Sequence, residues 1–182
     1  MQVLSRLSSF PPGRDDHLIA PALLSERGYA LRPLRGDDLP WLRELYASTR
    51  TEELTLVAWP DAAKRVFLDS QFALQYQHYL AHYGDSDFLA IERDSVPVGR
   101  YYLQRSAPDH LIVDICLFPG ERGRGVAAAL IAHSQDEAAA QGCGMKLHAQ
   151  ADNVAAQRLY RRLGFTVIED QRSHLLLRWA LD

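Results

Sequence analysis

The sequence predicts an α/β (α+β) fold: a single domain with a mixed central sheet of about six to seven strands and helices on both faces. The chain has 182 residues, the size of one generous domain, and 47% of them are apolar, which is enough for a core. Its predicted elements run in the order strand, two helices, three strands, helix, strand, helix, two strands. The strand–helix–strand unit near the middle should be parallel, because such crossovers join parallel strands.

The first 24 residues are predicted to be an N-terminal arm or extension, and residues 25–182 the domain. Pro11-Pro12-Gly13 and Arg14-Asp15-Asp16 interrupt any regular element in the arm. They also leave no continuous apolar stretch for a signal peptide. No segment approaches the roughly 18 apolar residues that span a bilayer. Two cysteines, Cys116 and Cys143, are too few for a disulfide framework, so we expect a cytoplasmic protein.

Residues 29–83 are predicted to form one strand and two helices. Residues 29–34 alternate polar and apolar side chains, as a strand does, and reach a proline near their end. A turn at residues 36–40 leads into a helix. The apolar side of that helix carries Trp41, Leu42, Leu45 and Tyr46. Residues 61–83 follow a helical pattern that Gly84-Asp85 ends.

An antiparallel hairpin and a central strand follow. Residues 88–92 and 96–104 are predicted strands joined by a turn at Arg93-Asp94-Ser95. The apolar run at residues 111–118 is too short for a globular helix, and Pro119-Gly120 bounds it. It is therefore predicted to be a central strand.

The rest of the chain alternates helix and strand. Residues 126–141 should form a helix ended by Gly142, with a ridge of Val126, Leu130, Ser134 and Ala138. Residues 145–150 are a strand. Asp152-Asn153 can cap the next helix, residues 154–163, which Gly164 ends. Strands at residues 165–168 and 174–181 close the chain.

The junction before residue 126 carries the first functional signal. In Arg122-Gly123-Arg124-Gly125, the glycines let the backbone approach a ligand with no Cβ in the way. The free N–H groups and partial positive charge of the following helical turn favour a pyrophosphate. Arg122 and Arg124 add charged donors at the rim. Alone, the pattern fits equally well a glycine turn with solvated arginines.

Other nucleotide motifs fit this junction less well. The chain has no Gly-x-x-x-x-Gly-Lys-Ser/Thr, and Gly123-x-Gly125 lacks the third glycine of a dinucleotide fingerprint. A formal charge of −3 gives no basic surface for a nucleic acid.

Residues 112–165 resemble the GNAT (GCN5-related N-acetyltransferase) superfamily. The family's Gln/Arg-x-x-Gly-x-Gly/Ala is met by Arg122-Gly123-Arg124-Gly125-Val126-Ala127. Its Asn-x-x-Ala-x-x-Leu-Tyr-x-x-x-Gly-Phe is matched from Asn153 to Phe165, through Ala156, Leu159, Tyr160 and Gly164. Residues 29–104 match only by the order of strands and helices, and residues 1–24 have no counterpart.

The resemblance implies a GNAT-like fold with acetyl-CoA, a cosubstrate, wedged between two splayed central strands. By position, the backbone of Ile115, Cys116 and Leu117 would line the pantetheine arm. The pyrophosphate would be held by Arg122, Gly123, Arg124, Gly125, Val126 and Ala127. Asn153 would contact the pantetheine or its neighbouring backbone, and Tyr160 would lie beside the thioester.

The implied reaction is direct attack of an amine on the thioester, with no metal. It requires a deprotonated amine, a stabilised oxyanion and a proton for the leaving thiolate. Tyr160 is the candidate acid, because a phenol is a neutral donor at pH 7. The alternative is core packing, since Ala156, Leu159, Tyr160 and Leu163 share one helix face. The motif favours the acid.

The sequence offers more than one candidate for the general base. His148 lies on a strand five residues before Asn153, where some relatives have a glutamate base. An imidazole titrates near neutrality and suits the role, directly or through water; the alternative is a half-exposed strand histidine. Asp114 is the rival, as a base or an amine anchor, because a carboxylate inside an apolar strand must be satisfied. No glutamate stands at the usual base positions, so a water chain could accept the proton.

Three further features are read mainly as structural. Phe72, Tyr76, Tyr79 and Tyr83 make a stripe on the predicted 61–83 helix that is more often core than an aromatic acceptor wall. His78 and His82 lie one turn apart, but no third zinc ligand is evident. Cys116 is expected to be a small buried apolar residue rather than a nucleophile.

The sequence therefore predicts an acetyl-CoA:amine N-acetyltransferase whose acceptor it leaves open. A catalytically silent acyl-CoA-binding sensor or interaction module is the alternative. A toxin that acetylates charged tRNA would predict a basic face, and the negative net charge argues against it. The expected partners are acetyl-CoA and an amine, without nucleic acid or membrane. A homodimer through the C-terminal strands is compatible with the sequence.

Overall fold

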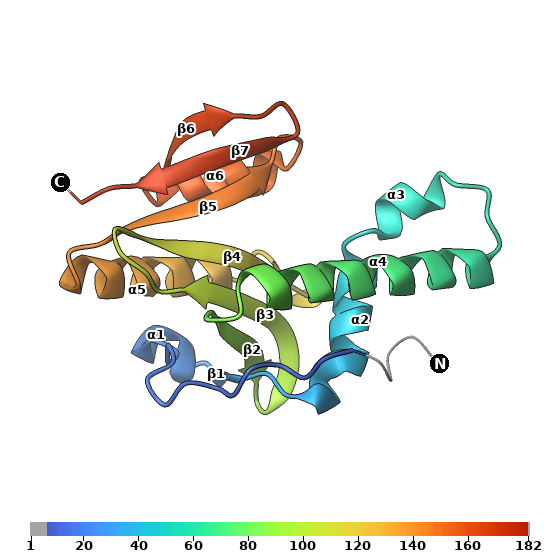
Figure 1. Ribbon diagram of the computed structural model, residues 1–182, viewed down its shortest axis with the longest axis horizontal. Coiled ribbons are helices and arrows are strands. Elements are labelled where there is room, and N and C mark those ends of the chain that lie inside the picture. Colours follow the sequence, from blue (N-terminus) through green and yellow to red (C-terminus); the bar gives the residue numbers. More distant parts are fainter. Residues whose placement is uncertain (1–6, 182) are drawn as a thin grey trace.

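The computed structural model describes residues 7–181 and has one seven-stranded mixed sheet with helices on both faces (Figure 1). The strand order is β1-β2-β3-β4-β5-β7-β6, and every neighbouring pair is antiparallel except β4 and β5. The strands are β1 (Tyr29–Pro33), β2 (Asp87–Arg93), β3 (Val96–Gln104), β4 (Asp109–Leu117), β5 (Gly144–Gln150), β6 (Thr166–Asp170) and β7 (His174–Trp179). The predicted fold class and the parallel β4–α5–β5 unit are confirmed.

The helices agree with the predicted order and add two short ones. They are α1 (Ala22–Ser25), α2 (Leu39–Ser48), α3 (Thr51–Thr55), α4 (Asp61–His82), α5 (Val126–Ala140) and α6 (Val154–Arg162), with 3-10 turns η2 (Gly36–Asp38) and η3 (Pro119–Glu121). Helices α1 and α3 were not predicted, because four or five residues are too few for a helical period to show. The four-residue ridge predicted on α5 is buried, as expected.

Two hydrophobic clusters lie on the two faces of the sheet. One joins α1, α5 and α6 to alternate side chains of β2, such as Leu89 and Ile91. The other joins α2 and α4 to the intervening side chains, Phe88 and Ala90. Successive strand residues point to opposite faces, and both faces of β2 are covered. Residues 88–91 are therefore a continuous apolar run.

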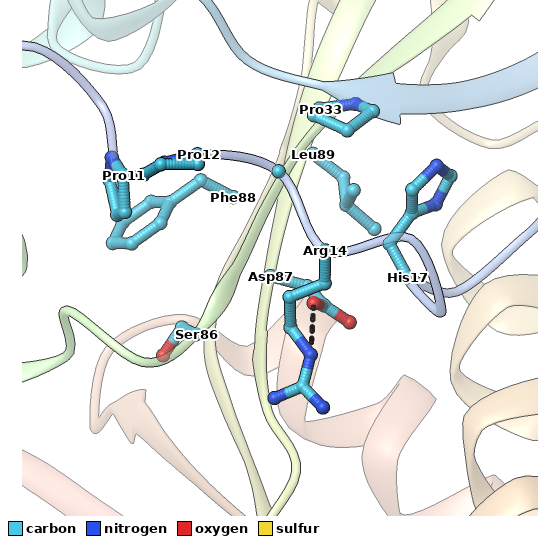
Figure 2. A pocket seen from close by; sticks show the side chains of 10 residues that line it. Pro11, Pro12, Arg14, His17, Pro33, Ser86, Asp87, Phe88 and Leu89 are labelled. Carbon is cyan, nitrogen blue, oxygen red and sulfur yellow. Dashed lines mark ion pairs between the residues drawn. The ribbon is translucent and has the colours of Figure 1, made fainter.

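The described part of the predicted arm packs on the domain. Phe10 meets the ring of Tyr76 edge-on, with centroids 5.1 Å apart, while Leu18 is buried in the cluster on the opposite face. Figure 2 shows the segment beside the start of β2, with Arg14 3.8 Å from the buried carboxylate of Asp87. Residues 1–6 of the arm lie outside the described residues, and its boundary at residue 24 stays a prediction.

The sheet opens at its middle. Strands β4 and β5 pair only from Asp109 opposite Gly144 to Ile112 opposite Leu147. Beyond that point β4 runs on to Leu117 and β5 to Gln150 with no pairing between them. In Figure 1, β5, β7, β6 and α6 accordingly diverge from the half formed by β1 to β4. The unpaired ends of β4 and β5 frame the candidate site.

Within residues 7–181, no helix combines the length and the apolar character that crossing a membrane requires.

Candidate active site

The gap between β4 and β5 is a cleft of about 1020 Å³. Its walls come from α2, α3 and α4 on one side of the sheet, and from the β4–α5 loop, α5 and α6 on the other. All but one of the predicted site residues line it. They are Asp114, Ile115, Cys116, Leu117, Arg122, Gly123, Gly125, Val126, Ala127, His148, Asn153 and Tyr160.

Residues 122–127, the predicted phosphate cradle, have the backbone conformation that an anion site needs. Gly123 and Gly125 have φ of +73° and +79°, a region that favours glycine, and a Cβ at either would meet no atom within 4 Å. The N–H of Ala129 donates to Gly125 O at 2.9 Å. The three preceding N–H groups of α5 therefore have no hydrogen bond to any described residue and remain available at the positive end of the helix.

The two arginines of the cradle donate to backbone carbonyls that precede it. Nε of Arg122 donates to Leu117 O at 2.9 Å and so ties the end of β4 to the loop, while the side chain still lines the cleft. Nε of Arg124 donates to Gly120 O at 3.0 Å, and Arg124 does not line the cleft. Arg124 thus stabilises the loop before α5, and its predicted contact with pyrophosphate stays untested.

Glu121 is a cleft residue that the sequence analysis did not single out. The Tyr29 hydroxyl and Arg93, whose Nη1 lies 3.3 Å away, donate to its carboxylate. These donors hold the pKa of Glu121 below its ordinary value. The carboxylate beside the anion site is therefore already hydrogen-bonded and ion-paired within the chain.

Tyr160 is packed in the core and also lines the cleft, and its predicted role as the acid stays untested. Its ring is buried and packs edge-on against Phe165 at 6.1 Å. Its hydroxyl has no hydrogen bond to any described residue, and the side chain lines the cleft. Burial, with a contribution from Asp114, raises the pKa of Tyr160 to about 12, so the phenol holds its proton at neutral pH.

Asp114 belongs to a buried polar network. Its Oδ2 accepts from Nη2 of Arg100 at 2.6 Å and from the Tyr79 hydroxyl at 2.9 Å. The same Nη2 donates to Gln75 at 2.8 Å. Burial alone would lower the pKa of Arg100, but Asp114 and nearby tyrosines outweigh it, so the pKa lies above its usual value. Asp114 is thus the counter-ion of a buried guanidinium.

Sequence reasoning missed this network because its members come from α4, β3 and β4. The available signal was Arg100 itself, a charged residue beside the apolar run Tyr101-Tyr102-Leu103. A charge buried in a strand needs a partner, but the sequence does not say which.

His148 is exposed on β5 and shares its face with a second histidine. In the antiparallel pair of β5 and β7, Gln150 lies opposite His174, and His148 lies opposite Leu176. Residues two apart on a strand point the same way, so His148 and His174 are on one face, and both line the cleft. His174 was not a predicted site residue, because strand pairing brings it there.

Asn153 accepts a hydrogen bond from the N–H of Ala156 at 3.0 Å and caps α6, as its predicted capping role requires. Its predicted contact with a ligand is not tested by this bond. The side chain lines the cleft at the end of β5.

The aromatic stripe on α4 divides between core and cleft. Phe72 and Tyr76 are buried in the α2–α4 cluster, whereas Tyr79 and Tyr83 line the cleft. His78 also lines it and stacks on His82 with centroids 4.2 Å apart. No group of three or more metal-ligating side chains occurs within the described residues.

Cys116 lies on β4 in the cleft wall and is only partly buried. Burial raises the pKa of its thiol, which keeps the sulfur protonated at neutral pH. Its surroundings therefore do not activate it as a nucleophile.

Comparisons with known proteins agree with this geometry. A family model described as the acetyltransferase (GNAT) family matches residues 42–165. Mycothiol acetyltransferase of Brachybacterium faecium is 31% identical over 149 residues, which are 75% of this chain and 45% of that protein. The chain thus spans less than half the length of this curated relative.

Two solved structures illustrate the shared fold. PaiA N-acetyltransferase from Thermoplasma acidophilum, in complex with coenzyme A, has a TM-score of 0.64 at 16% identity, over 84% of this chain and 99% of that one. The ribosomal-protein-S18-alanine N-acetyltransferase of Escherichia coli has a TM-score of 0.57 at 17% identity, over 85% of this chain and 96% of that one.

Proposed function

Because this chain belongs to the acetyltransferase (GNAT) family, we propose that it is an N-acetyltransferase that moves the acetyl group of acetyl-CoA to a primary amine. The observation that carries the proposal is that one cleft joins the backbone of residues 122–127 to the protonated hydroxyl of Tyr160, which has no partner among the described residues. Donor binding and proton delivery to a leaving thiolate need these two features side by side.

Acetyl-CoA is proposed to lie between the unpaired ends of β4 and β5. The N–H groups that begin α5 would hold its pyrophosphate, with Arg122 at the rim. The backbone of residues 115–117 lies beyond the last β4–β5 pair, so no neighbouring strand pairs with it on that side. Leu117 O already accepts from Arg122, and the other polar groups on that side would bind the pantetheine amides. Asn153 closes the opposite wall at the end of β5.

The proposed chemistry is a single acyl transfer. The amine nitrogen attacks the thioester carbonyl, a C–N bond forms and the C–S bond breaks. Tyr160 donates its proton to the leaving sulfur, and the attacking amine gives up its own proton. No group of the protein is acylated on the way.

His148 is the proposed acceptor of the amine proton, directly or through water. It is exposed in the cleft and makes no hydrogen bond to any described residue. The rival, Asp114, has one oxygen bound by both Arg100 and Tyr79, and only Oδ1 is left for an acceptor. A His148→Gln variant should therefore lose more activity at neutral pH than at pH 10, where a much larger share of the amine is already deprotonated.

A screen for thiol release tests the function. Purified protein and acetyl-CoA are incubated with a library of amines, and free CoA is measured with and without each amine, while calorimetry measures acetyl-CoA binding. Amine-dependent release supports the enzyme. Tight binding with no release from any amine would instead support the acyl-CoA-binding sensor.

A further inference from the structure

We infer that the acceptor half of the cleft selects an amine that carries a carboxylate or another acidic group, and disfavours polycations. The acceptor half is defined as the cleft-lining side chains of residues 46–83, which include Arg50 between α2 and α3, and those of β5 and β7, with Arg100 and Asp114 of the sheet. The inference rests on the proposed function and adds the chemical class of the acceptor.

The carboxylates of this half are already neutralised by the chain itself. Among the described side chains that line it, the acidic ones are Glu53 and Asp114. Asp114 is paired with Arg100 at 2.6 Å, and Glu53 with Arg50 at 3.1 Å. An acceptor with several ammonium groups would find no unpaired carboxylate among these side chains. To bind Asp114 or Glu53 it would have to displace the arginine that already pairs with that carboxylate.

The remaining polar side chains of this half add no negative charge, and each can donate a hydrogen bond. His78, His148 and His174 line it, and none has a carboxylate partner among the described residues. Each neutral imidazole has one N–H donor and each charged one has two, whereas a carboxylate only accepts hydrogen bonds. The chain as a whole carries a formal charge of −3. The lack of unpaired carboxylates among the described side chains of this half is therefore a local property of the cleft.

Arg50 is the proposed anchor for the acidic group. Its guanidinium lies over the ring of Tyr46, 5.7 Å from the centroid, and this contact holds the side chain at the cleft wall. Its partner Glu53 is 66% exposed in its side chain, so solvent weakens that pair. A carboxylate on the acceptor can therefore share or replace Glu53 as the counter-ion of Arg50.

The test compares acceptors that differ only in charge. C-terminally amidated tripeptides with the same N-terminal alanine carry glutamate, glutamine or lysine in the second position, and short linear amines end in a carboxylate, a carboxamide or a second ammonium. Initial rates of CoA release give kcat/KM for each, at low salt and at high salt.

Acidic acceptors are expected to exceed their cationic counterparts at least about fivefold at low salt, and less at high salt, because screening weakens exposed charge pairs. Arg50→Gln should bring the ratio to within about twofold, mainly through KM. Arg43→Gln is the matched control: Arg43 lies on α2, pairs with Asp69 at 3.0 Å and does not line the cleft. It should keep the wild-type ratio.

Equal or faster turnover of the cationic acceptors would overturn this inference and leave the N-acetyltransferase intact. An acidic preference that survives Arg50→Gln would overturn it too, since the proposed anchor would then contribute nothing. Acetyl-CoA binding with no release from any acceptor would overturn the proposed function itself.

Discussion

At the scale of single residues, the side chain of Tyr160 contacts both the hydrophobic core and the cleft. Its ring contributes to the core beside Phe165, while its hydroxyl faces the cleft without a partner among the described residues. A buried phenol with a free hydroxyl stays protonated and can still reach a ligand. The same burial that makes it a packing residue thus makes it a suitable acid.

Tyr160→Phe should lower kcat by about 100-fold or more, the usual contribution of a general acid, with acetyl-CoA affinity nearly unchanged. Removing only the hydroxyl leaves the ring packing in place. Thiol-release kinetics measure kcat and calorimetry measures Kd. A kcat within about threefold of the wild type would show that another group protonates the thiolate.

The pH dependence of kcat/KM should follow from the same hydroxyl. An acid acts while protonated, and a pKa of about 12 keeps Tyr160 protonated throughout the working range. The rate should rise with pH as the acceptor amine and the base lose protons, then level off with no fall up to about pH 10. A fall in kcat/KM near pH 8 would mean that the acid that protonates the thiolate is a different group with a lower pKa.

At the scale of elements, the two glycines that flank α5 allow the effect of backbone conformation to be measured separately from the effect of ligand contact. Both ends of α5 have a glycine in the left-handed region with open space where a Cβ would stand: Gly125 before it, with φ +79°, and Gly142 after it, with φ +69°. Only Gly125 lines the cleft. The two positions therefore form a matched pair.

Gly125→Ala and Gly142→Ala should each destabilise the fold by about 1 kcal/mol, because a left-handed conformation strains alanine. Only Gly125→Ala should also weaken acetyl-CoA binding, by about tenfold or more, since its new Cβ enters the anion site. Urea unfolding and calorimetry measure the two effects. Equal affinities in both variants would remove residues 122–127 from the donor site.

At the scale of the whole molecule, the N-terminal segment contributes to both cores of the domain. Phe10 lies in the cluster on the α4 face and Leu18 in the cluster on the α5 face. Arg105, near the end of β3, pairs with Asp16 at 3.3 Å and with the buried Asp87 at 3.0 Å. The segment therefore joins the two faces across the start of β2.

Leu18→Ala should lower the free energy of unfolding by about 3 kcal/mol, because it leaves a cavity in a packed core. Its neighbour Ile19 is 65% exposed, against 1% for Leu18, so Ile19→Ala should change stability by less than about 0.5 kcal/mol. Urea denaturation of both variants gives the comparison. Similar small losses would mean that residues 7–21 detach before the domain unfolds.

The order and type of the long elements, and the glycine-rich turn before α5, could be predicted from the sequence alone. Periodicity, caps and glycine turns are local: the α5 ridge, the Asn153 cap and the hairpin before Val96 are all as predicted. The sequence also brought Tyr160 and His148 forward as candidates, because a motif and its spacing are properties of the chain alone.

Three features became known from the assembled fold: how far β4 and β5 pair, that β7 lies between β5 and β6, and which side chains contact Asp114. Arg100, Tyr79 and His174 reach the cleft through contacts between residues that are distant along the chain. Such contacts depend on strand register and on how the helices pack, which no local pattern encodes. The cleft, and the charge balance that points to its acceptor, exist only once those elements are assembled.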